Sequence, residues 1–310
     1  MKDLTTLYHG SMAALPTPYR LGRVDLPALE TLCHRLVAHG TSALVPCGTT
    51  GEGSLLTPDE HRQVVATTVA AAAGRVPVIA GASSNNTQTA LELARSAEQA
   101  GASAILAVTP FYLKPSQAGI VAHFRAIHDA VGIPVLLYDV PARTGVALDD
   151  VTVKRLAELP RIAGLKDATG DIARVGRLRR RLGQDFLLLS GDDATQAAFR
   201  LAGGNGCISV TANVAPALCA ALQRACDDRL EGDIQWYEQV LAPLHAVLFL
   251  EANPIPLKRA LFRMGLMGDG LRLPLTPLSP EFDRKLGQVL DAIAPVEQKE
   301  ARRFAAKRAA

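Results

Sequence analysis

Lys166 has the setting in this sequence that most directly suggests chemistry. It follows the apolar run 161–165 in the stretch GLKDATGD, and it is one of eight lysines, against 25 arginines. Removal from water disfavours the ammonium form of a lysine. The neutral amine can attack a carbonyl carbon to form a Schiff base, which then acts as an electron sink. Lys166 is therefore a candidate nucleophile, with a solvent-facing lysine as the alternative.

Several hydroxyl groups stand near other apolar runs. Tyr138 and Tyr112 are candidate proton carriers, although each also suits an ordinary core or rim position. The turn GTTGE at 48–52 offers the hydroxyls of Thr49 and Thr50 together with backbone N–H groups. This turn either holds a carboxylate or only leads into a capped helix. Arg143 can grip a carboxylate with two parallel hydrogen bonds, or it forms a surface ion pair.

Other polar residues suggest less. Asp192-Asp193 lacks further ligands at metal-binding spacing, so we expect one of the two to cap a helix. The histidines lie mostly in predicted helices or their flanks and receive no catalytic role. They are His9, His34, His39, His61, His123, His128 and His245.

The elements that position these residues form a repeating series. Short apolar runs cover residues 11–16, 43–48, 77–82, 104–110, 134–140, 161–167, 186–192 and 206–210. Helix-like segments separate them, which predicts parallel strands buried on both faces. Eight such units favour an α/β fold of the (β/α)8 TIM-barrel type over an open doubly wound sheet, since no GxGxxG follows the first run. Barrel chemistry belongs at the carboxyl ends of strands, where Lys166, Tyr138 and Thr49 fall.

Helix boundaries are also readable. Thr57 is a predicted N-cap, with Pro58 in the first turn and Glu60 three residues after the cap, for a helix reaching about residue 74. Another helix is predicted to start at Asp149 and to end before Pro160.

The strand pattern stops near residue 222, and helices are predicted at 233–251, around 254–265 and at 280–296. We therefore predict a barrel at 1–222, carrying the active site, and a helical C-terminal domain at 223–310. The basic end, QKEARRFAAKRAA, is interpreted as a solvated helical tail.

Composition narrows the class of protein. The chain has 310 residues, 48% of them hydrophobic, and a net charge of +3, which indicates a globular protein without a nucleic-acid partner. Neither a signal peptide nor a membrane span is evident. Reduced thiols and a cytoplasmic location are expected, because the five cysteines are scattered without a CxxC pair. They are Cys33, Cys47, Cys207, Cys219 and Cys226.

Six motifs occur in a fixed order: GTTGE, VTPFYLKPS, YDVPARTG, GLKDATGD, LSGDD and GCISVTANV. Together they resemble the dihydrodipicolinate synthase family, which belongs to the Schiff-base pyruvate lyases with N-acetylneuraminate lyase. The likeness runs from about Gly10 to about Thr276. It implies condensation of pyruvate with L-aspartate 4-semialdehyde to 4-hydroxy-tetrahydrodipicolinate, the step that opens the diaminopimelate branch of lysine biosynthesis. It also implies a homotetramer of two tight dimers, without a metal or organic cofactor.

The resemblance assigns catalytic roles to four residues. Lys166 forms the imine with pyruvate, and Tyr138 donates and accepts protons beside it. Thr49 and Tyr112 complete a proton relay, with Tyr112 reaching into the site of a neighbouring subunit.

Four further residues are implied in substrate binding. Thr50 and the backbone of Ile208 hold the pyruvate carboxylate, and Arg143 receives the carboxylate of the semialdehyde. Gly191 belongs to the same set.

Some positions depart from the family pattern. Pro58 stands where regulated bacterial members often have histidine, Thr89 where they have glutamate, and Phe111 where they have tyrosine, while His61 and Asn85 are retained. A lost carboxylate and a lost hydroxyl weaken the hold on an ammonium group. We therefore predict weak feedback inhibition by lysine.

Other departures leave the assignment intact. Asp139 stands where the family usually has asparagine, in a supporting role, and the tail after Val296 is not explained by the resemblance. One rival is a related lyase or dehydratase that acts on a keto-deoxy sugar acid or N-acetylneuraminate. Arg143 argues against it, since sialic-acid lyases usually lack that arginine. A more remote rival is a non-catalytic keto-acid sensor, which would need a broken catalytic set.

Overall fold

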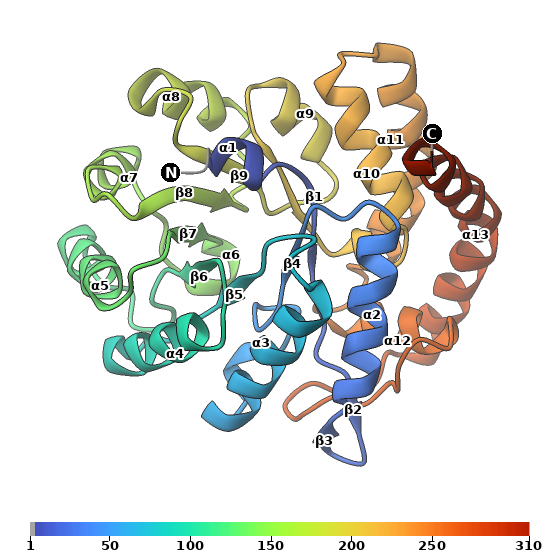
Figure 1. The fold of residues 1–310 in the computed structure, drawn as a ribbon, viewed down its shortest axis with the longest axis horizontal. Helices are drawn as coiled ribbons and strands as arrows, with labels where there is room; N and C mark the ends of the chain where they lie inside the picture. The colour runs from blue at the N-terminus through green and yellow to red at the C-terminus, as the bar shows by residue number, and fades with distance from the viewer. Residues whose placement is uncertain (1–3, 310) are drawn as a thin grey trace.

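Eight parallel strands form the centre of the molecule in the computed structural model, which describes residues 4–309 (Figure 1). Residues 1–3 and 310, assigned above to the barrel and the tail, lie outside the described residues. Each strand overlaps one predicted apolar run. The strands are β1 (Gly10–Ala14), β4 (Ala43–Val45), β5 (Ile79–Gly81), β6 (Ala104–Val108), β7 (Val135–Asp139), β8 (Ile162–Asp167), β9 (Leu187–Ser190) and β10 (Gly206–Ser209).

The sheet curls into a nearly closed barrel. Its hydrogen-bonded order is β4-β1-β10-β9-β8-β7-β6-β5, so β4 and β5 are its two edges. These edges meet through Leu44 N, which donates to Pro77 O at 3.1 Å, and Gly81 N, which donates to Pro46 O at 2.9 Å. The predicted (β/α)8 architecture is therefore confirmed.

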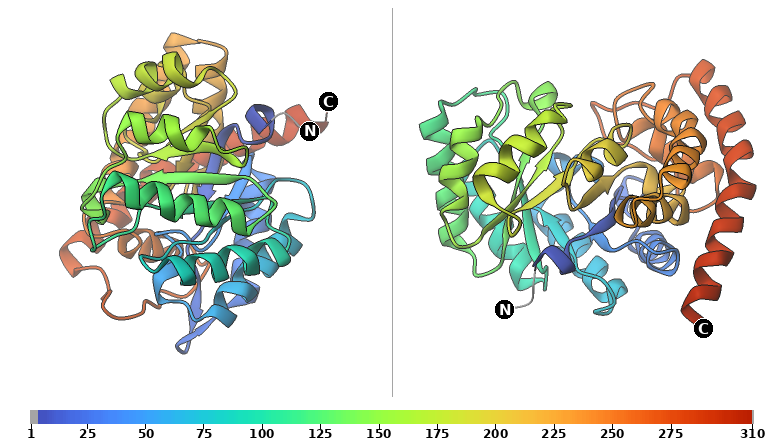
Figure 2. Two further views of the ribbon diagram at one scale, coloured as in Figure 1. Left: turned by 90° about the vertical axis from the view of Figure 1, so that its left-hand side faces the viewer. Right: turned by 90° about the horizontal axis from the view of Figure 1, so that it is seen from above.

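Helices surround the barrel, as the strand spacing predicts (Figures 1 and 2). They are α2 (Leu26–Ala38), α3 (Pro58–Ala72), α4 (Thr87–Gln99), α5 (Gln117–Ala130), α7 (Asp150–Ala157), α8 (Ala173–Leu182), α9 (Gln196–Leu201) and α10 (Pro216–Asp227). The Thr57 capping box is confirmed, because its side chain accepts from Glu60 N while Glu60 accepts from Thr57 N. The helix predicted from Asp149 is confirmed as α7.

Small elements that the sequence did not predict precede the first strand or connect these units. They are α1 (Leu4–Leu7), the hairpin of β2 (Tyr19–Arg20) and β3 (Arg23–Val24), the 3-10 turns η1 (Gly53–Leu55) and η2 (Thr211–Asn213), and α6 (Pro141–Thr144).

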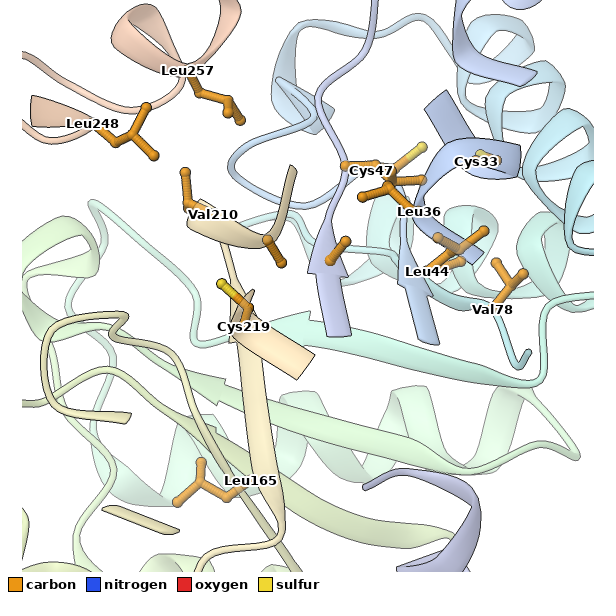
Figure 3. Close-up of a cluster of buried hydrophobic side chains, with 14 of the residues drawn as sticks. Cys33, Leu36, Leu44, Cys47, Val78, Leu165, Val210, Cys219, Leu248 and Leu257 are labelled. Carbon is orange, nitrogen blue, oxygen red and sulfur yellow. The ribbon is translucent and has the colours of Figure 1, made fainter. Parts of the chain in front are cut away.

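The apolar side chains form two layers because successive residues of a strand face opposite sides. Leu136 and Tyr138 belong to the cluster inside the barrel, whereas Leu137 faces the helices. In the outer layer, Leu36 of α2 lies near Leu44 of β4 (Figure 3). Full burial of one such leucine stabilises the fold by about 1.5–3 kcal/mol.

A helical part lies beside the barrel (Figure 2). Its helices are α11 (Glu231–Val247), α12 (Ile255–Arg263) and α13 (Pro280–Ala309), which confirms the three predicted helices. Leu248 and Leu257 from this part join the outer apolar layer near Val210 (Figure 3). The division at residue 222 stays a prediction, and α10 runs across that position. Within residues 4–309, no helix combines the length and apolarity needed to cross a membrane.

The basic tail, residues 298–310, was predicted as a solvated helix: α13 confirms the helix, and residues 298–307 are mostly exposed, with Glu300 buried. Glu297, which follows Val296, is buried and accepts from Ala217 N at 2.9 Å and Leu218 N at 3.0 Å. These N–H groups open α10 and lack partners within that helix. Glu297, one residue before the basic tail, therefore caps α10 and ties this part of α13 to it.

Candidate active site

Lys166 and Tyr138 form the centre of the site. They are register partners on the adjacent strands β8 and β7, so both side chains point to the barrel interior. Lys166 Nζ lies 4.3 Å from the centre of the Tyr138 ring, and each side chain is only 7% exposed. Among residues 4–309, no carboxylate forms an ion pair with Lys166. An amine without a counter-ion is thus held against a phenol.

Gly191 makes room for the lysine. A Cβ at this position would lie 3.0 Å from Cε of Lys166 and 2.9 Å from Cβ of Ala168. Its backbone is fixed by a hydrogen bond from Gly191 N to Asp167 O at 2.7 Å. Gly191 therefore shapes the space around the lysine stem, while its role in binding substrate stays a prediction.

A cavity of about 320 Å³ opens at the carboxyl ends of the strands. Thr49, Tyr138 and Arg143 line it, so the structure brings three of the predicted residues to one space. Lys166 is not among the lining residues, but its Nζ lies against the Tyr138 ring, which does line the cavity. Arg143, exposed on α6, donates from Nη2 to Asn253 O at 3.3 Å. The volume suits small substrates, and the exposed guanidinium suits a carboxylate.

Thr50 is held just behind the cavity wall. It is buried, and its Oγ1 accepts from Asn253 Nδ2 at 2.9 Å. Asn253 lines the cavity but was not identified from the sequence as a site residue. The available signal was the stretch NPIPLKRALFRMG, in which Asn253 directly precedes the helix predicted around 254–265.

Ile208 lies in β10 with 1% exposure, next to a turn that Asp193 organises. Asp193 Oδ2 accepts from Val210 N at 2.9 Å and Thr211 N at 3.1 Å, and Ser209 Oγ donates to Oδ1. The carboxylate thus fixes the backbone that follows Ile208.

The predicted N-cap role for Asp192-Asp193 is wrong. The N-cap of α9 is Thr195, without a side-chain cap, because the loop continues for two residues beyond Asp193 before the helix starts. Asp193 instead accepts from the backbone N–H groups of Val210 and Thr211, where η2 begins. Asp192 Oδ1 accepts from Ala194 N at 2.9 Å. No metal-binding group of three or more histidine, cysteine or acidic side chains occurs in the described part of the chain.

Within one chain, Tyr112 lies apart from the candidate residues that line the cavity. Its side chain is 84% exposed and does not line the cavity. Its φ of +70° is rare for a bulky residue. The segment is anchored by Tyr112 N, which donates to Thr144 O at 3.3 Å, so an unusual backbone directs an aromatic side chain away from this subunit's own cavity.

A buried charge network lies directly behind the two central residues. Asp139 and Asp167, each one residue beyond Tyr138 and Lys166, are register partners facing outward. Arg174 of α8 donates from Nη1 to both carboxylates, at 2.8 Å and 3.2 Å. Burial raises the pKa of Asp139, although Arg174 opposes the shift. The supporting role expected for Asp139 is consistent with this buried pair with Arg174. The sequence did not reveal Arg174 as its partner.

The sequence of this chain is similar to those of proteins from one known family. The model of the dihydrodipicolinate synthetase family matches residues 7–293. A 4-hydroxy-tetrahydrodipicolinate synthase from Parvibaculum lavamentivorans is 50% identical over 90% of this chain and 96% of its own. One from Hyphomonas neptunium is 52% identical over 87% and 93%, respectively.

Solved structures of dihydrodipicolinate synthases have the same fold as this chain. A chloride-inhibited dihydrodipicolinate synthase from Acinetobacter baumannii, in complex with pyruvate, superposes with a TM-score of 0.90 at 43% identity, over 92% of this chain and 99% of that one. The enzyme from Cyanidioschyzon merolae with lysine bound also gives 0.90, at 36% identity, over 93% and 99%.

Proposed function

Because the chain belongs to the dihydrodipicolinate synthetase family, we propose that it condenses pyruvate with L-aspartate 4-semialdehyde to 4-hydroxy-tetrahydrodipicolinate. The observation that carries this proposal is the buried amine of Lys166, held 4.3 Å from the Tyr138 ring beside a cavity that Thr49 and Arg143 line. Schiff-base chemistry needs such an amine together with a proton carrier.

The first stage joins Lys166 to pyruvate. The amine attacks the keto carbon, and loss of water leaves an imine between Nζ and that carbon. Tyr138 passes the protons that the departing water needs. The methyl carbon then gives up a proton to form an enamine, with the imine nitrogen as the electron sink.

The second stage builds the product. The enamine carbon attacks the aldehyde carbon of the semialdehyde, and the new alkoxide takes a proton. The amine of the semialdehyde then attacks the imine carbon, which closes the ring and releases Lys166. No redox step occurs: one water leaves when the imine forms, and the other transfers move only protons.

Carboxylate binding orients both substrates. In this proposal Thr50 and the Ile208 backbone hold pyruvate, and Arg143 holds the semialdehyde at the cavity mouth. The hydrogen bond to Thr50 from Asn253 and the fixed turn after Ile208 support these roles.

We also propose that Tyr112 enters the site of a neighbouring subunit, within a homotetramer of two tight dimers. Tyr112 and Leu113, exposed by 84% and 63%, form an apolar projection suited to a subunit interface. Tyr112 would then complete the proton relay with Thr49 and Tyr138 in the neighbouring subunit.

Lysine should inhibit the enzyme weakly. His61 is retained but buried, with Nε2 hydrogen-bonded to Gly81 O at 2.7 Å, and burial lowers its pKa. Pro58 and Thr89 offer no charge to a lysine ligand. An assay with millimolar lysine tests this proposal, and strong inhibition contradicts it.

We propose a cytoplasmic location. All five cysteines are buried and unpaired, which suits a reducing compartment.

A coupled assay tests the function. Pyruvate with L-aspartate 4-semialdehyde should give rapid turnover, whereas N-acetylneuraminate cleavage, assayed in parallel, should be negligible. Preferential cleavage of the sugar acid would instead indicate a related lyase.

A further inference from the structure

The loop that carries Thr49 and Thr50 has a strained backbone. Cys47 and Glu52 adopt left-handed φ values of +58° and +52°, which residues with a Cβ rarely adopt. The loop also folds closely on itself, since a Cβ at Gly53 would lie 2.1 Å from Cys47 O. Such a conformation persists only where the surroundings hold it in place.

A buried ion pair supplies one such restraint. Lys258 Nζ donates to Glu52 Oε1, and the two side chains are 0% and 1% exposed. Lys258 belongs to α12, so the pair joins residues 206 positions apart. Nζ also lies 4.0 Å from the centre of the Tyr19 ring. The other oxygen of Glu52 accepts from Arg272 N at 3.2 Å, so both of its oxygens have partners.

The restraint continues along the same segment. Asn253, on the segment leading into α12, donates to Thr50 Oγ1 at 2.9 Å. Thr17 Oγ1 donates to Gly51 O at 2.6 Å. Every residue from Thr50 to Glu52 is therefore held from outside the loop: Thr50 by Asn253, Gly51 by Thr17, and Glu52 by Lys258 and Arg272.

We propose that Lys258 is a positioning residue for the reaction: through Glu52 it fixes the loop that presents Thr50 to the pyruvate carboxylate. The inference rests on the proposed function. Glu52 lines the cavity but Lys258 does not, so Lys258 acts through the loop and not on the substrate. Releasing the pair lets the Thr50 hydroxyl drift, and small misplacements of binding groups weaken reactions strongly.

The test measures pyruvate binding separately from the aldehyde. Borohydride traps the Lys166–pyruvate imine, and the half-saturating pyruvate concentration is read from the trapping yield. The main variant is Lys258→Met/Glu52→Gln, which removes both charges and leaves neither one buried alone. We expect half-saturation to rise about tenfold, with a saturable yield and a retained thermal transition.

A second variant and a matched control complete the design. Glu52→Gln alone keeps an oxygen facing Lys258 and should give a smaller rise. Should the double variant fail to fold, Glu52→Gln alone decides. Arg259→Met removes a charge from the same helix, where Arg259 pairs with Asp283, and should leave half-saturation unchanged.

The outcomes are distinct. Wild-type half-saturation in the folded double variant, or in Glu52→Gln where that variant decides, would overturn the role of Lys258. A rise of equal size in Arg259→Met would also overturn it, because any loss of charge on α12 would then suffice. Absence of trapping in the unaltered protein would instead reject the proposed function.

Discussion

Two lysines are buried in the described part of the chain, and their surroundings differ in one decisive respect. Lys166 is 7% exposed and faces a tyrosine ring, with no ion-pair partner among residues 4–309. Lys258 is fully buried, also lies over a tyrosine ring, and pairs with Glu52. Burial is thus common to both, and the counter-ion separates them. Burial lowers the pKa of Lys258 to about 8, although Glu52 opposes the shift, and the ion pair keeps this amine engaged. No carboxylate among those residues engages the Lys166 amine, so it is the one left available to attack a carbonyl carbon.

The largest expected effect is on turnover, which should depend on the Lys166 amine far more than on Lys258. Lys166→Ala should reduce turnover by about a thousandfold or more, because no other lysine among the described residues lies over the Tyr138 ring or lines the cavity. Lys166→Arg should fail equally, since a guanidinium stays protonated. Steady-state assays check both variants, with circular dichroism as the control for folding. Substantial turnover in Lys166→Arg would contradict a nucleophilic role.

The unfolding free energy should depend on the two lysines in the opposite order, with the larger loss on substitution of Lys258. Lys258→Met leaves the Glu52 carboxylate buried without its partner, which should cost about 3–5 kcal/mol in unfolding free energy. Lys166→Met removes an unpaired buried amine and should be neutral or stabilising, within about 1–2 kcal/mol. Urea unfolding measures both. Equal destabilisation by the two substitutions would remove the distinction drawn from the counter-ion.

The space around Lys166 offers a sharper test. Gly191→Ala places a Cβ against the lysine stem and should lower kcat/KM for pyruvate by about tenfold to a hundredfold. Gly176→Ala is the matched control. The nearest atom to a Cβ there is 3.6 Å away, on the Arg180 side chain, and this helical position should gain about 0.5–1 kcal/mol. An unaffected Gly191→Ala enzyme would show that the lysine position is not critical.

The smallest expected effect concerns a second ion pair, between Arg272 and Glu60, which is more exposed than the pair of Lys258 with Glu52. Hydrogen bonds from Arg272 lower the pKa of Glu60 from 4.5 to about 2. A depressed pKa stabilises the fold above the unfolded value, and this contribution is lost as pH falls through about 2.

Glu60→Gln should therefore cost about 1 kcal/mol at pH 7, because the pair is partly solvated. The difference from the unaltered protein should shrink as unfolding is measured from pH 5 toward pH 2. Glu158→Gln, at an exposed carboxylate, serves as the control. A cost that does not change with pH would contradict the assigned pair.

The sequence predicted the barrel because strands covered on both faces form continuous apolar runs, and β8 with its terminal Lys166 is such a run. It did not predict the partner of Asp193, since that contact depends on where the loop before α9 ends. Lys258 was also missed, because helix periodicity does not show which lysine meets an acidic residue 206 positions away. The environment of Tyr112 stays a prediction, since it depends on a second chain.

Borohydride reduction in the presence of pyruvate, followed by peptide mass spectrometry, tests the central claim most directly. We expect one reduced pyruvyl adduct per chain, located on Lys166, with Lys258 unmodified. An adduct on another lysine, or none at saturating pyruvate, would contradict it.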